Sequence, residues 1–404
     1  MSGSAIRTLV LSVAYPSRAS YYDDWREAFE AAPAFAVDCA NVFHGGARRR
    51  VARRLGDYEL IVLLHSCTAD SLYYITPLAG ALQARRGRLL AFIGNEVNLP
   101  SAPIAPKRAF LKSIAPDFVA TQLPLEAGDY LWGDCGGRVI AVPHALNPDA
   151  FRPERPCAER PVDLGTRSYR YLAYLGDDDR NRIYDFFREH RFASPPTLDF
   201  ATDDRFERAG WAAFLNRCKG TVSTEAGSWY IERDDATVTA IRAYFAGQRK
   251  GLVVAGDSPL RRLAHRLPYG FKAWLKRLMR AGPLRYEAAA DEAMDWAEIE
   301  ARFFADRPRC PAYGKCISSR HFDAIGTKTL QIMFPGRFND ILVADRHYLA
   351  LAPDFSNIDD VMYRFRDPDH HCRLVDEAHD FVRAGHTYAD RLAALARTLG
   401  EGGD

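Results

Sequence analysis

The stretch Ile317-Ser-Ser-Arg-His-Phe-Asp-Ala-Ile-Gly-Thr-Lys-Thr-Leu-Gln-Ile-Met-Phe334 reads as a loop, a short helix and an apolar strand. Ser318 and Ser319 are of the type that caps a helix, and the N–H groups and positive dipole at a helix N-terminus attract anions. Arg320 adds a planar cation suited to phosphate, and Asp323, one turn later, is placed to accept hydrogen bonds from both ribose hydroxyls. The stretch therefore predicts a nucleotide site.

Apolar, β-branched runs alternate with helical stretches along much of the chain. Such alternation indicates parallel sheets with helices on both faces. The first series of runs covers residues 7–14, 59–64, 89–93, 117–121 and 138–142, and a second covers 171–175, 197–200, 220–223, 329–333 and 348–351. We therefore expect an α/β fold with two doubly wound, Rossmann-like domains facing a cleft, with ligands beyond the carboxyl ends of the strands.

The length of 404 residues also favours two domains. Residues 1–150 are expected to form the first domain, and the charged, proline-rich stretch 151–168 is expected to be a linker. The second domain is assigned to residues 169–380. Residues 381–404 are expected to form a C-terminal helix that packs back on the first domain.

Composition narrows the possible classes of protein. A net charge of +2 does not suggest a nucleic-acid binder. The eight cysteines are scattered, and we find neither a signal peptide nor a run of apolar residues long enough to span a membrane, which predicts a reduced, cytoplasmic protein. Cys310 and Cys316 lack two further ligands at zinc-site spacing, so thiols are the simpler interpretation.

A helical insertion is expected over about residues 240–310, outside the strand–helix alternation. Within it, residues 258–282 carry leucine and aromatic residues at three-to-four-residue spacing, with arginine and lysine mostly on other faces. One interpretation is a helical pair packed on the second domain with solvated arginines. The other is a peripheral attachment to the inner face of an anionic membrane.

The segment Arg320-His-Phe-Asp-Ala, followed by Thr329-Leu-Gln-Ile-Met, resembles the donor-binding segment of GT-B glycosyltransferases, in the "glycosyl transferases group 1" or CgeB-like branch. The closing segments His347-Tyr-Leu-Ala-Leu and Gly385-His-Thr-Tyr-Ala-Asp-Arg391 are similar to that family too. The resemblance implies a nucleoside-diphosphate sugar as donor on the second domain and no metal cofactor. Two departures are Asp323, where the family usually has Glu, and Lys315, where many relatives carry Glu.

Several further residues are candidates for donor binding. Arg320 and Lys328 are expected to meet the charge of the leaving diphosphate, with Arg180 or Arg182 in reserve. Lys328 is alternatively a solvated turn residue. In Gly176-Asp-Asp-Asp-Arg180, the glycine is expected to let a nucleotide approach, although the aspartates also permit a metal interpretation. Glu225 and Ser228 follow a strand and are expected at the cleft, because the resemblance implies a functional Glu, Gly and Ser here.

Two residues of the first domain are candidates for catalysis. Glu96 and His65 each follow a buried strand, and either could act as a general base near an acceptor hydroxyl. The alternative is that each only caps a neighbouring turn.

Together these observations predict an enzyme that moves a sugar from a nucleoside-diphosphate sugar to an acceptor hydroxyl, in polysaccharide, glycolipid or other glycan assembly. An epimerase-like enzyme acting on the nucleotide sugar, and a non-catalytic nucleotide-sugar-binding protein, are the two alternatives. The expected partners are the nucleotide sugar and a glycan or lipid-linked acceptor, with no nucleic acid.

Overall fold

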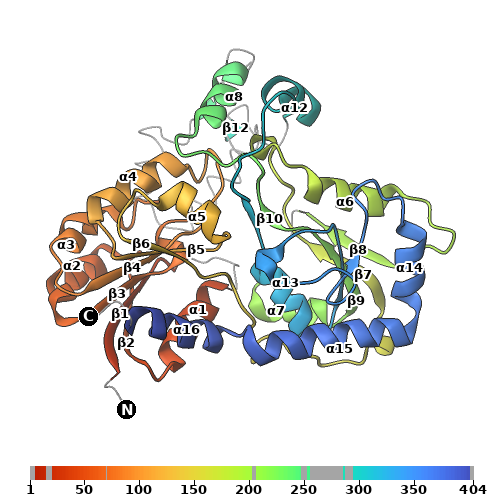
Figure 1. The fold of residues 1–404 in the computed structure, drawn as a ribbon, viewed down its shortest axis with the longest axis horizontal. Helices are drawn as coiled ribbons and strands as arrows, with labels where there is room; N and C mark the ends of the chain where they lie inside the picture. The colour runs from red at the N-terminus through yellow and green to blue at the C-terminus, as the bar shows by residue number, and fades with distance from the viewer. Residues whose placement is uncertain are drawn as a thin grey trace.

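The computed structural model describes residues 5–14, 21–69, 71–202, 206–246, 253–254, 285–286 and 294–400. These residues form two α/β domains side by side, each built on a parallel sheet (Figure 1). The predicted fold class is therefore confirmed. Continuous apolar strands such as Leu60–Leu63, buried at every position, suit sheets that are covered on both faces.

The first sheet has six parallel strands in the order β2-β1-β3-β4-β5-β6. The strands are β1 (Ile6–Ser12), β2 (Phe35–Asn41), β3 (Leu60–Leu63), β4 (Arg88–Phe92), β5 (Phe118–Thr121) and β6 (Arg138–Ala141). The helices between them are α1 (Tyr21–Ala31), α2 (Gly45–Arg54), α3 (Ala79–Gln83), α4 (Ile104–Ile114) and α5 (Leu125–Trp132), with short 3₁₀ turns at Leu55–Asp57, His65–Cys67 and Thr76–Leu78. The chain order reverses between β1 and β3, which makes that position the topological switch point.

The second sheet has five parallel strands in the order β15-β14-β9-β7-β8. They are β7 (Val162–Arg167), β8 (Leu198–Ala201), β9 (Cys218–Ser223), β14 (Leu330–Met333) and β15 (Leu349–Ala350). Around them lie α6 (Asp179–Glu189), α7 (Arg208–Leu215), α13 (Ser319–Gly326), α14 (Ile358–Arg366) and α15 (Pro368–Gly385), and 3₁₀ turns at Cys157–Glu159, Ala173–Leu175 and Phe338–Asp340. Its switch point lies between β7 and β9.

The start of the second sheet differs from the sequence prediction. The strand expected at residues 171–175 is wrong, because Ala173–Leu175 is a 3₁₀ turn. The first strand is instead β7, inside the stretch assigned to the linker. Three prolines among charged residues precede β7, so the segment resembled a linker. Val162, Leu164 and Thr166 nevertheless occupy every second position, as the inward-facing residues of a strand do. The exposed edge strand β2 was also missed.

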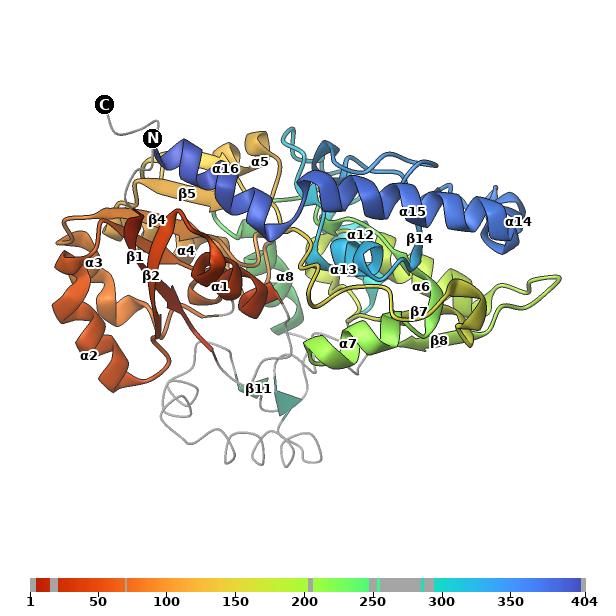
Figure 2. The same cartoon turned by 90° about the horizontal axis from the view of Figure 1, so that it is seen from below.

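The C-terminal helix α16 (Tyr388–Gly400) packs on the first domain beside α1. Figure 2 shows α15 running along the second domain and α16 continuing over the first sheet. Tyr388, Leu392, Leu395 and Leu399 join the core that contains Trp25 of α1. The chain thus crosses between the domains at Leu146, whose N–H donates to His386 O (2.9 Å), and at Tyr388, whose N–H donates to Leu146 O (3.1 Å).

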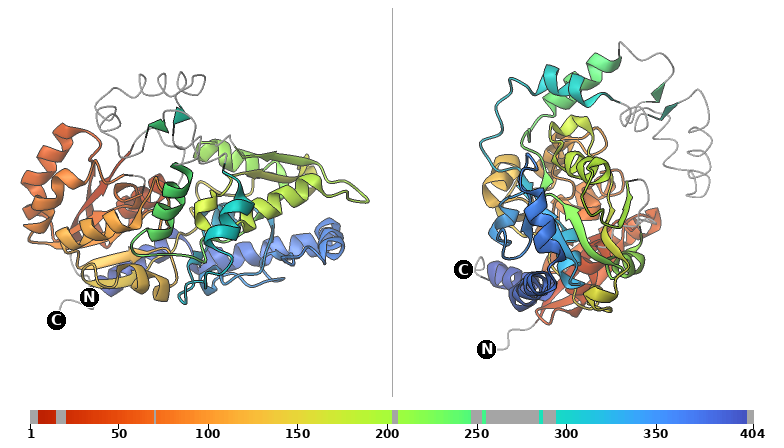
Figure 3. Two further views of the ribbon diagram at one scale, coloured as in Figure 1. Left: turned by 90° about the horizontal axis from the view of Figure 1, so that it is seen from above. Right: turned by 90° about the vertical axis from the view of Figure 1, so that its right-hand side faces the viewer.

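Two further helices, α8 (Ala236–Ala246) and α12 (Trp296–Phe303), stand next to each other outside both sheets (Figure 3). Ile241 and Ile299 pack there against Tyr174. The described residues also include four two-residue strands outside the two large sheets, β10 (Ala226–Gly227) paired with β13 (Lys315–Cys316) and β11 (Val253–Val254) paired with β12 (Arg285–Tyr286). The basic segment 258–282 lies outside the described residues, and none of the described helices is long and apolar enough to cross a bilayer.

Candidate functional site

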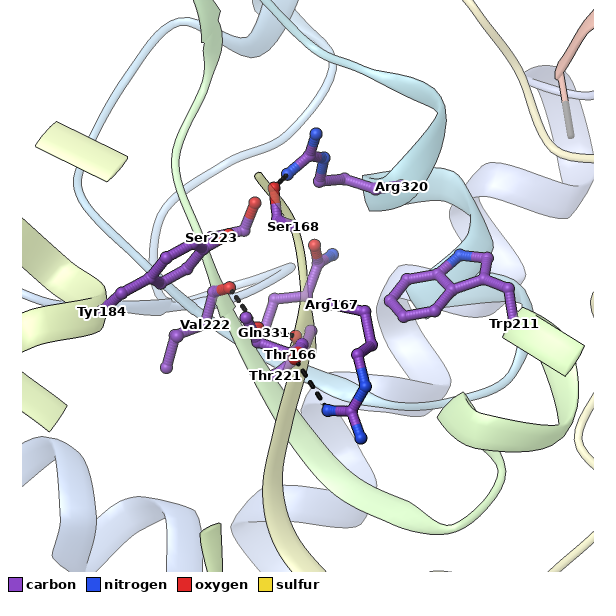
Figure 4. A pocket seen from close by; sticks show the side chains of 10 residues that line it. All are labelled: Thr166, Arg167, Ser168, Tyr184, Trp211, Thr221, Val222, Ser223, Arg320 and Gln331. Atoms are coloured by element: carbon purple, nitrogen blue, oxygen red, sulfur yellow. Dashed lines mark hydrogen bonds between the residues drawn. The ribbon is translucent and has the colours of Figure 1, made fainter. Parts of the chain in front are cut away.

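A small pocket lies at the switch point of the second sheet, where the carboxyl ends of β7, β9 and β14 meet the N-terminus of α13 (Figure 4). Ligands of doubly wound domains bind at this position. The cavity volume is about 10 Å³, roughly room for one water molecule. Ten residues line it, namely Thr166, Arg167, Ser168, Tyr184, Trp211, Thr221, Val222, Ser223, Arg320 and Gln331.

Ser318 is the N-cap of α13, as predicted, and forms a capping box with His321, whereas Ser319 is the first residue of the helix rather than a cap. The Ser318 N–H donates to His321 Nδ1 at 3.0 Å, so this nitrogen carries no proton. The proton is then on Nε2, which lies 3.2 Å from Thr224 O and 3.1 Å from Ser223 Oγ. Burial lowers the pKa of His321 to about 3. The neutral His321 ring therefore links α13 to the end of β9 through hydrogen bonds.

Arg167 lines the pocket but is paired with Asp199 at 2.6 Å. The second cation of the pocket is Arg320. Its Nη1 donates to Ser168 Oγ at 2.6 Å, across from α13 to the residue that follows β7 (Figure 4). Gln331 of β14 is buried beside them, and its Oε1 has no hydrogen-bond partner among the described residues. The Arg320 guanidinium and the Ser168 hydroxyl, next to the positive end of a helix, can donate hydrogen bonds to phosphate oxygens. Gln331 Nε2 already donates to His321 O at 3.3 Å, so the free Oε1 suits a donor group rather than a phosphate oxygen.

Asp323 does not present a carboxylate to this pocket. Its side chain is 3% exposed, and its Oδ2 accepts a hydrogen bond from Trp211 Nε1 at 3.0 Å. Burial raises the pKa of Asp323 well above the usual range, and the nearby Asp24 raises it further. Trp211 lines the pocket, so Asp323 is placed to orient that indole. The expected ribose contact would require a solvent-accessible carboxylate, which this position does not offer.

Lys328 lies at the opposite end of α13 from the pocket. It follows the helix C-terminus with φ +53°, and its Nζ donates to Asp376 Oδ1 of α15 at 2.6 Å. An eight-residue helix is about 12 Å long, so Lys328 does not join Arg320. The alternative interpretation of a turn lysine fits this placement, with the side chain half-buried and paired with Asp376.

The remaining candidates for donor binding make internal contacts. Gly176 has φ +59°, and a Cβ there would lie 2.5 Å from the Phe304 ring, so its missing side chain makes room for α12 rather than for a nucleotide. The Arg180 guanidinium stacks 3.8 Å from the centre of the Tyr171 ring. Ser228 Oγ donates to Leu175 O at 2.7 Å. The side chains of Arg180 and Ser228 thus make contacts within the second domain.

Glu225 is buried between two loops. Its Oε1 accepts from the Phe338 N–H at 2.7 Å and its Oε2 from the Tyr313 hydroxyl at 2.5 Å. Burial raises its pKa, although both hydrogen bonds favour the carboxylate. Glu225 therefore fixes the loop after β14 and does not line the pocket.

A buried ion cluster occupies the position where relatives of the resembled family carry Glu. Lys315 Nζ lies 2.8 Å from Asp177 Oδ2 and 2.7 Å from Asp179 Oδ2, and 4.8 Å from the centre of the Trp229 ring. Burial lowers the pKa of Lys315, but the two carboxylates together outweigh burial and raise it. The aspartates are thus paired with a lysine, which leaves them poorly placed as ligands of a cation.

In the first domain, His65 lies at the switch point between β1 and β3. The imidazole is 1% exposed and sits among aromatic rings, with the centre of the His144 ring at 5.2 Å and that of Phe92 at 4.9 Å. Neither of its nitrogens has a hydrogen-bond partner among the described residues. Burial lowers its pKa well below the usual value, so the ring is neutral.

Glu96 is also buried, at the ends of β4 and β5. Its Oε2 accepts from the Thr121 hydroxyl and from Trp132 Nε1, both at 2.6 Å, and its Oε1 accepts from the Gln122 N–H at 2.7 Å. Burial raises its pKa. With these bonds made, Glu96 cross-links β5 and α5.

The residues around the pocket that the sequence reading missed lie mainly on β7, β9 and β14. Ser168 follows the overlooked strand β7, so recognising that strand would have placed a hydroxyl at the edge of the sheet. Gln331 is the one polar residue in the apolar run of β14, which is a visible signal. Within the described part of the chain, no group of three or more His, Cys, Asp or Glu side chains is arranged to hold a metal ion.

Comparisons with known proteins give structural neighbours only. No protein-family model and no curated protein sequence matches the chain. Among solved structures, the chain is similar to Anabaena Alr3699/HepE in complex with UDP-glucose (TM-score 0.47, 9% identity, 98% of this chain and 100% of that chain covered). It is also similar to sucrose-phosphate synthase from Thermosynechococcus elongatus (TM-score 0.47, 13% identity, 98% and 100% covered) and to a glycosyltransferase from Rickettsia africae (TM-score 0.46, 10% identity, 99% of each). Sequence identities of 9% to 13% and TM-scores of 0.46 to 0.47 are too low to assign an activity to this chain.

Proposed function

We propose that this protein transfers a sugar from a nucleoside-diphosphate donor to an acceptor hydroxyl. The observation that carries the proposal is the N-terminus of α13 with Arg320, set at the switch point of the second sheet. A diphosphate there would accept hydrogen bonds from helix N–H groups, from the Arg320 guanidinium and from Ser168. The same groups would stabilise the charge that grows on the leaving diphosphate.

The resemblance of residues 315–395 to the donor segment of GT-B glycosyltransferases of the CgeB-like branch supports the same proposal. The cavity holds about one water molecule, so a diphosphate would bind at its mouth after the Arg320–Ser168 hydrogen bond opens. Assembly of polysaccharide, glycolipid or another glycan is the setting that we propose, with the acceptor on the first domain. We propose that no metal ion takes part, because Arg320 and the helix terminus can supply positive charge.

The test is incubation with UDP-, GDP- and dTDP-sugars, with and without saccharide acceptors, followed by mass spectrometry of the products. We expect release of the nucleoside diphosphate together with an acceptor heavier by one sugar. A changed sugar on an intact nucleotide would identify an epimerase instead. Binding of the nucleotide sugar without any turnover would identify a non-catalytic binding protein.

A further inference from the structure

A large groove on the first domain lies outside the site described above. It runs between the edge strand β2 and the helix α2, with a cavity volume of about 550 Å³, which is within the range of ligand pockets. Its polar lining residues include Asp38, Asn41, His44, Arg50, Arg53, Arg54 and Tyr58. Asn41 ends β2 and His44 precedes α2, so one end of the groove opens at the carboxyl edge of the sheet.

The groove carries excess positive charge. The helix α2, Gly45–Arg54, contains five arginines and no acidic residue. Arg54 is balanced by Asp38 at 3.2 Å and Asp57 at 3.6 Å. Arg50 and Arg53 are exposed, and in the ranges that the structure describes neither has an acidic partner.

The spacing of these arginines is electrostatically unfavourable when no ligand is bound. Arg50 lies three residues from Arg53 and four from Arg54, and like charges at these spacings repel each other on a helix. An anionic ligand would relieve that repulsion. Guanidinium groups bind carboxylates and phosphates through two parallel hydrogen bonds, so two neighbouring arginines suit a ligand with more than one anionic group.

The shape of the groove favours an extended ligand. The ten residues of α2 span about 15 Å, and the arginines that line the groove, Arg50, Arg53 and Arg54, lie in the C-terminal half of the helix. The outer side of β2 has no neighbouring strand in the sheet, since β2 pairs with β1 alone. A chain with anionic groups could therefore lie along β2 from Asn41 toward Tyr58, in contact with arginines on one side and main-chain groups on the other.

We propose that this groove binds an acceptor saccharide that carries carboxylate or phosphate groups. The proposal rests on the proposed function in one respect, namely that the first domain binds the acceptor. Arg50 and Arg53 would hold the anionic groups, while the reacting end of the saccharide would leave the groove at the carboxyl edge near Asn41. The acceptor class is thus an acidic glycan chain rather than a neutral one.

The probes are hexagalacturonate, inorganic tripolyphosphate and neutral maltohexaose, titrated calorimetrically into the parent protein and into an Arg50→Gln, Arg53→Gln variant. An Arg188→Gln, Arg191→Gln variant is the matched control, because these arginines are exposed on the second domain. We expect the parent to bind at least one anionic probe more than tenfold tighter than maltohexaose. The Arg50, Arg53 variant should lose at least tenfold in that affinity, with the control unchanged.

Two results would overturn the proposal, namely no preference for the anionic probes, or equal affinity in the parent and the Arg50, Arg53 variant. Sedimentation with phosphatidylglycerol vesicles is the further arm, and Arg50- and Arg53-dependent binding to vesicles without saccharide binding would make this a membrane face and also overturn it. Nucleoside diphosphate binding is measured in the same preparations. If the anionic probes bind while nucleotides do not, the groove stands and the proposed donor site is what fails.

Discussion

The two domains share a topology but use their switch points differently. In the second domain, the end of β7 and β9 meets a helix N-terminus, a guanidinium and an amide oxygen without a partner. In the first domain, the end of β3 carries His65 under aromatic rings, and the nearby Glu96 makes three hydrogen bonds. Polar residues that follow buried strands can therefore either line a pocket or be buried within the domain. Their contacts, rather than their position after a strand, decide between these outcomes.

The first prediction concerns Glu96, where we expect the largest effect. Replacing Glu96 with alanine removes the acceptor for Thr121, Trp132 and the Gln122 N–H at once. Leaving buried donors unsatisfied should lower the free energy of unfolding by about 3 kcal/mol or more. Urea unfolding measures this.

Glu159→Ala, at an exposed 3₁₀ turn, serves as the control and should unfold like the parent. If Glu96→Gln is as stable as the parent but loses about 100-fold or more in turnover, the catalytic role proposed for Glu96 holds and the comparison between the domains breaks.

The second prediction concerns Asp24, which joins the two domains. Its Oδ1 accepts from Asn147 Nδ2 at 2.6 Å and from Arg208 Nη1 at 2.8 Å, yet burial raises its pKa from 3.8 to about 6. The folded chain thus holds this proton more tightly than the unfolded chain. The resulting stability is fully present below pH 3.8 and is lost as the pH rises through about 6.

Relative to Asp24→Asn, the parent should therefore lose about 3 kcal/mol in the free energy of unfolding between about pH 4 and pH 7. Asp23→Asn, at an exposed position of α1, is the matched control. Urea unfolding across this pH range checks the sign, and a constant difference between parent and Asp24→Asn would contradict it.

The third prediction separates two roles for Asp323. If it orients Trp211, then Asp323→Ala should weaken nucleotide binding by about 1 to 3 kcal/mol, while Asp323→Asn should bind almost as the parent, because the amide oxygen still accepts from Trp211 Nε1. Titration with UDP, GDP and dTDP measures both. Equal weakening in the two variants would instead indicate that the carboxylate contacts the ribose.

The smallest effect is expected at Lys328. Its Nζ is paired with Asp376 at the far end of α13, so Lys328→Ala should change nucleotide affinity by less than about twofold. A loss comparable to that expected at Arg320 would show that α13 or its surroundings rearrange when the nucleotide binds.

The sequence predicts the parallel sheets because continuous apolar runs such as Leu60–Leu63 are visible without a structure. It predicts the α13 N-terminus because Ser318 and Arg320 act through local geometry. It did not predict which buried polar side chains have hydrogen-bond partners. Glu96, for example, accepts from Thr121 and Trp132, which are 25 and 36 residues away along the chain. Likewise, Gly176 was expected to let a nucleotide approach because the sequence does not show that Phe304, distant along the chain, fills the space beside it.

The most direct test of the account is the effect of Arg320 on nucleotide binding. Calorimetric titration of UDP, GDP and dTDP into the parent should identify a ligand, and Arg320→Ala should weaken it at least tenfold. Arg188→Ala, an exposed arginine of α6, should leave the affinity unchanged. Equal affinity of the parent and Arg320→Ala for the nucleotide would contradict the assignment of the β7–β9 switch point as the donor site.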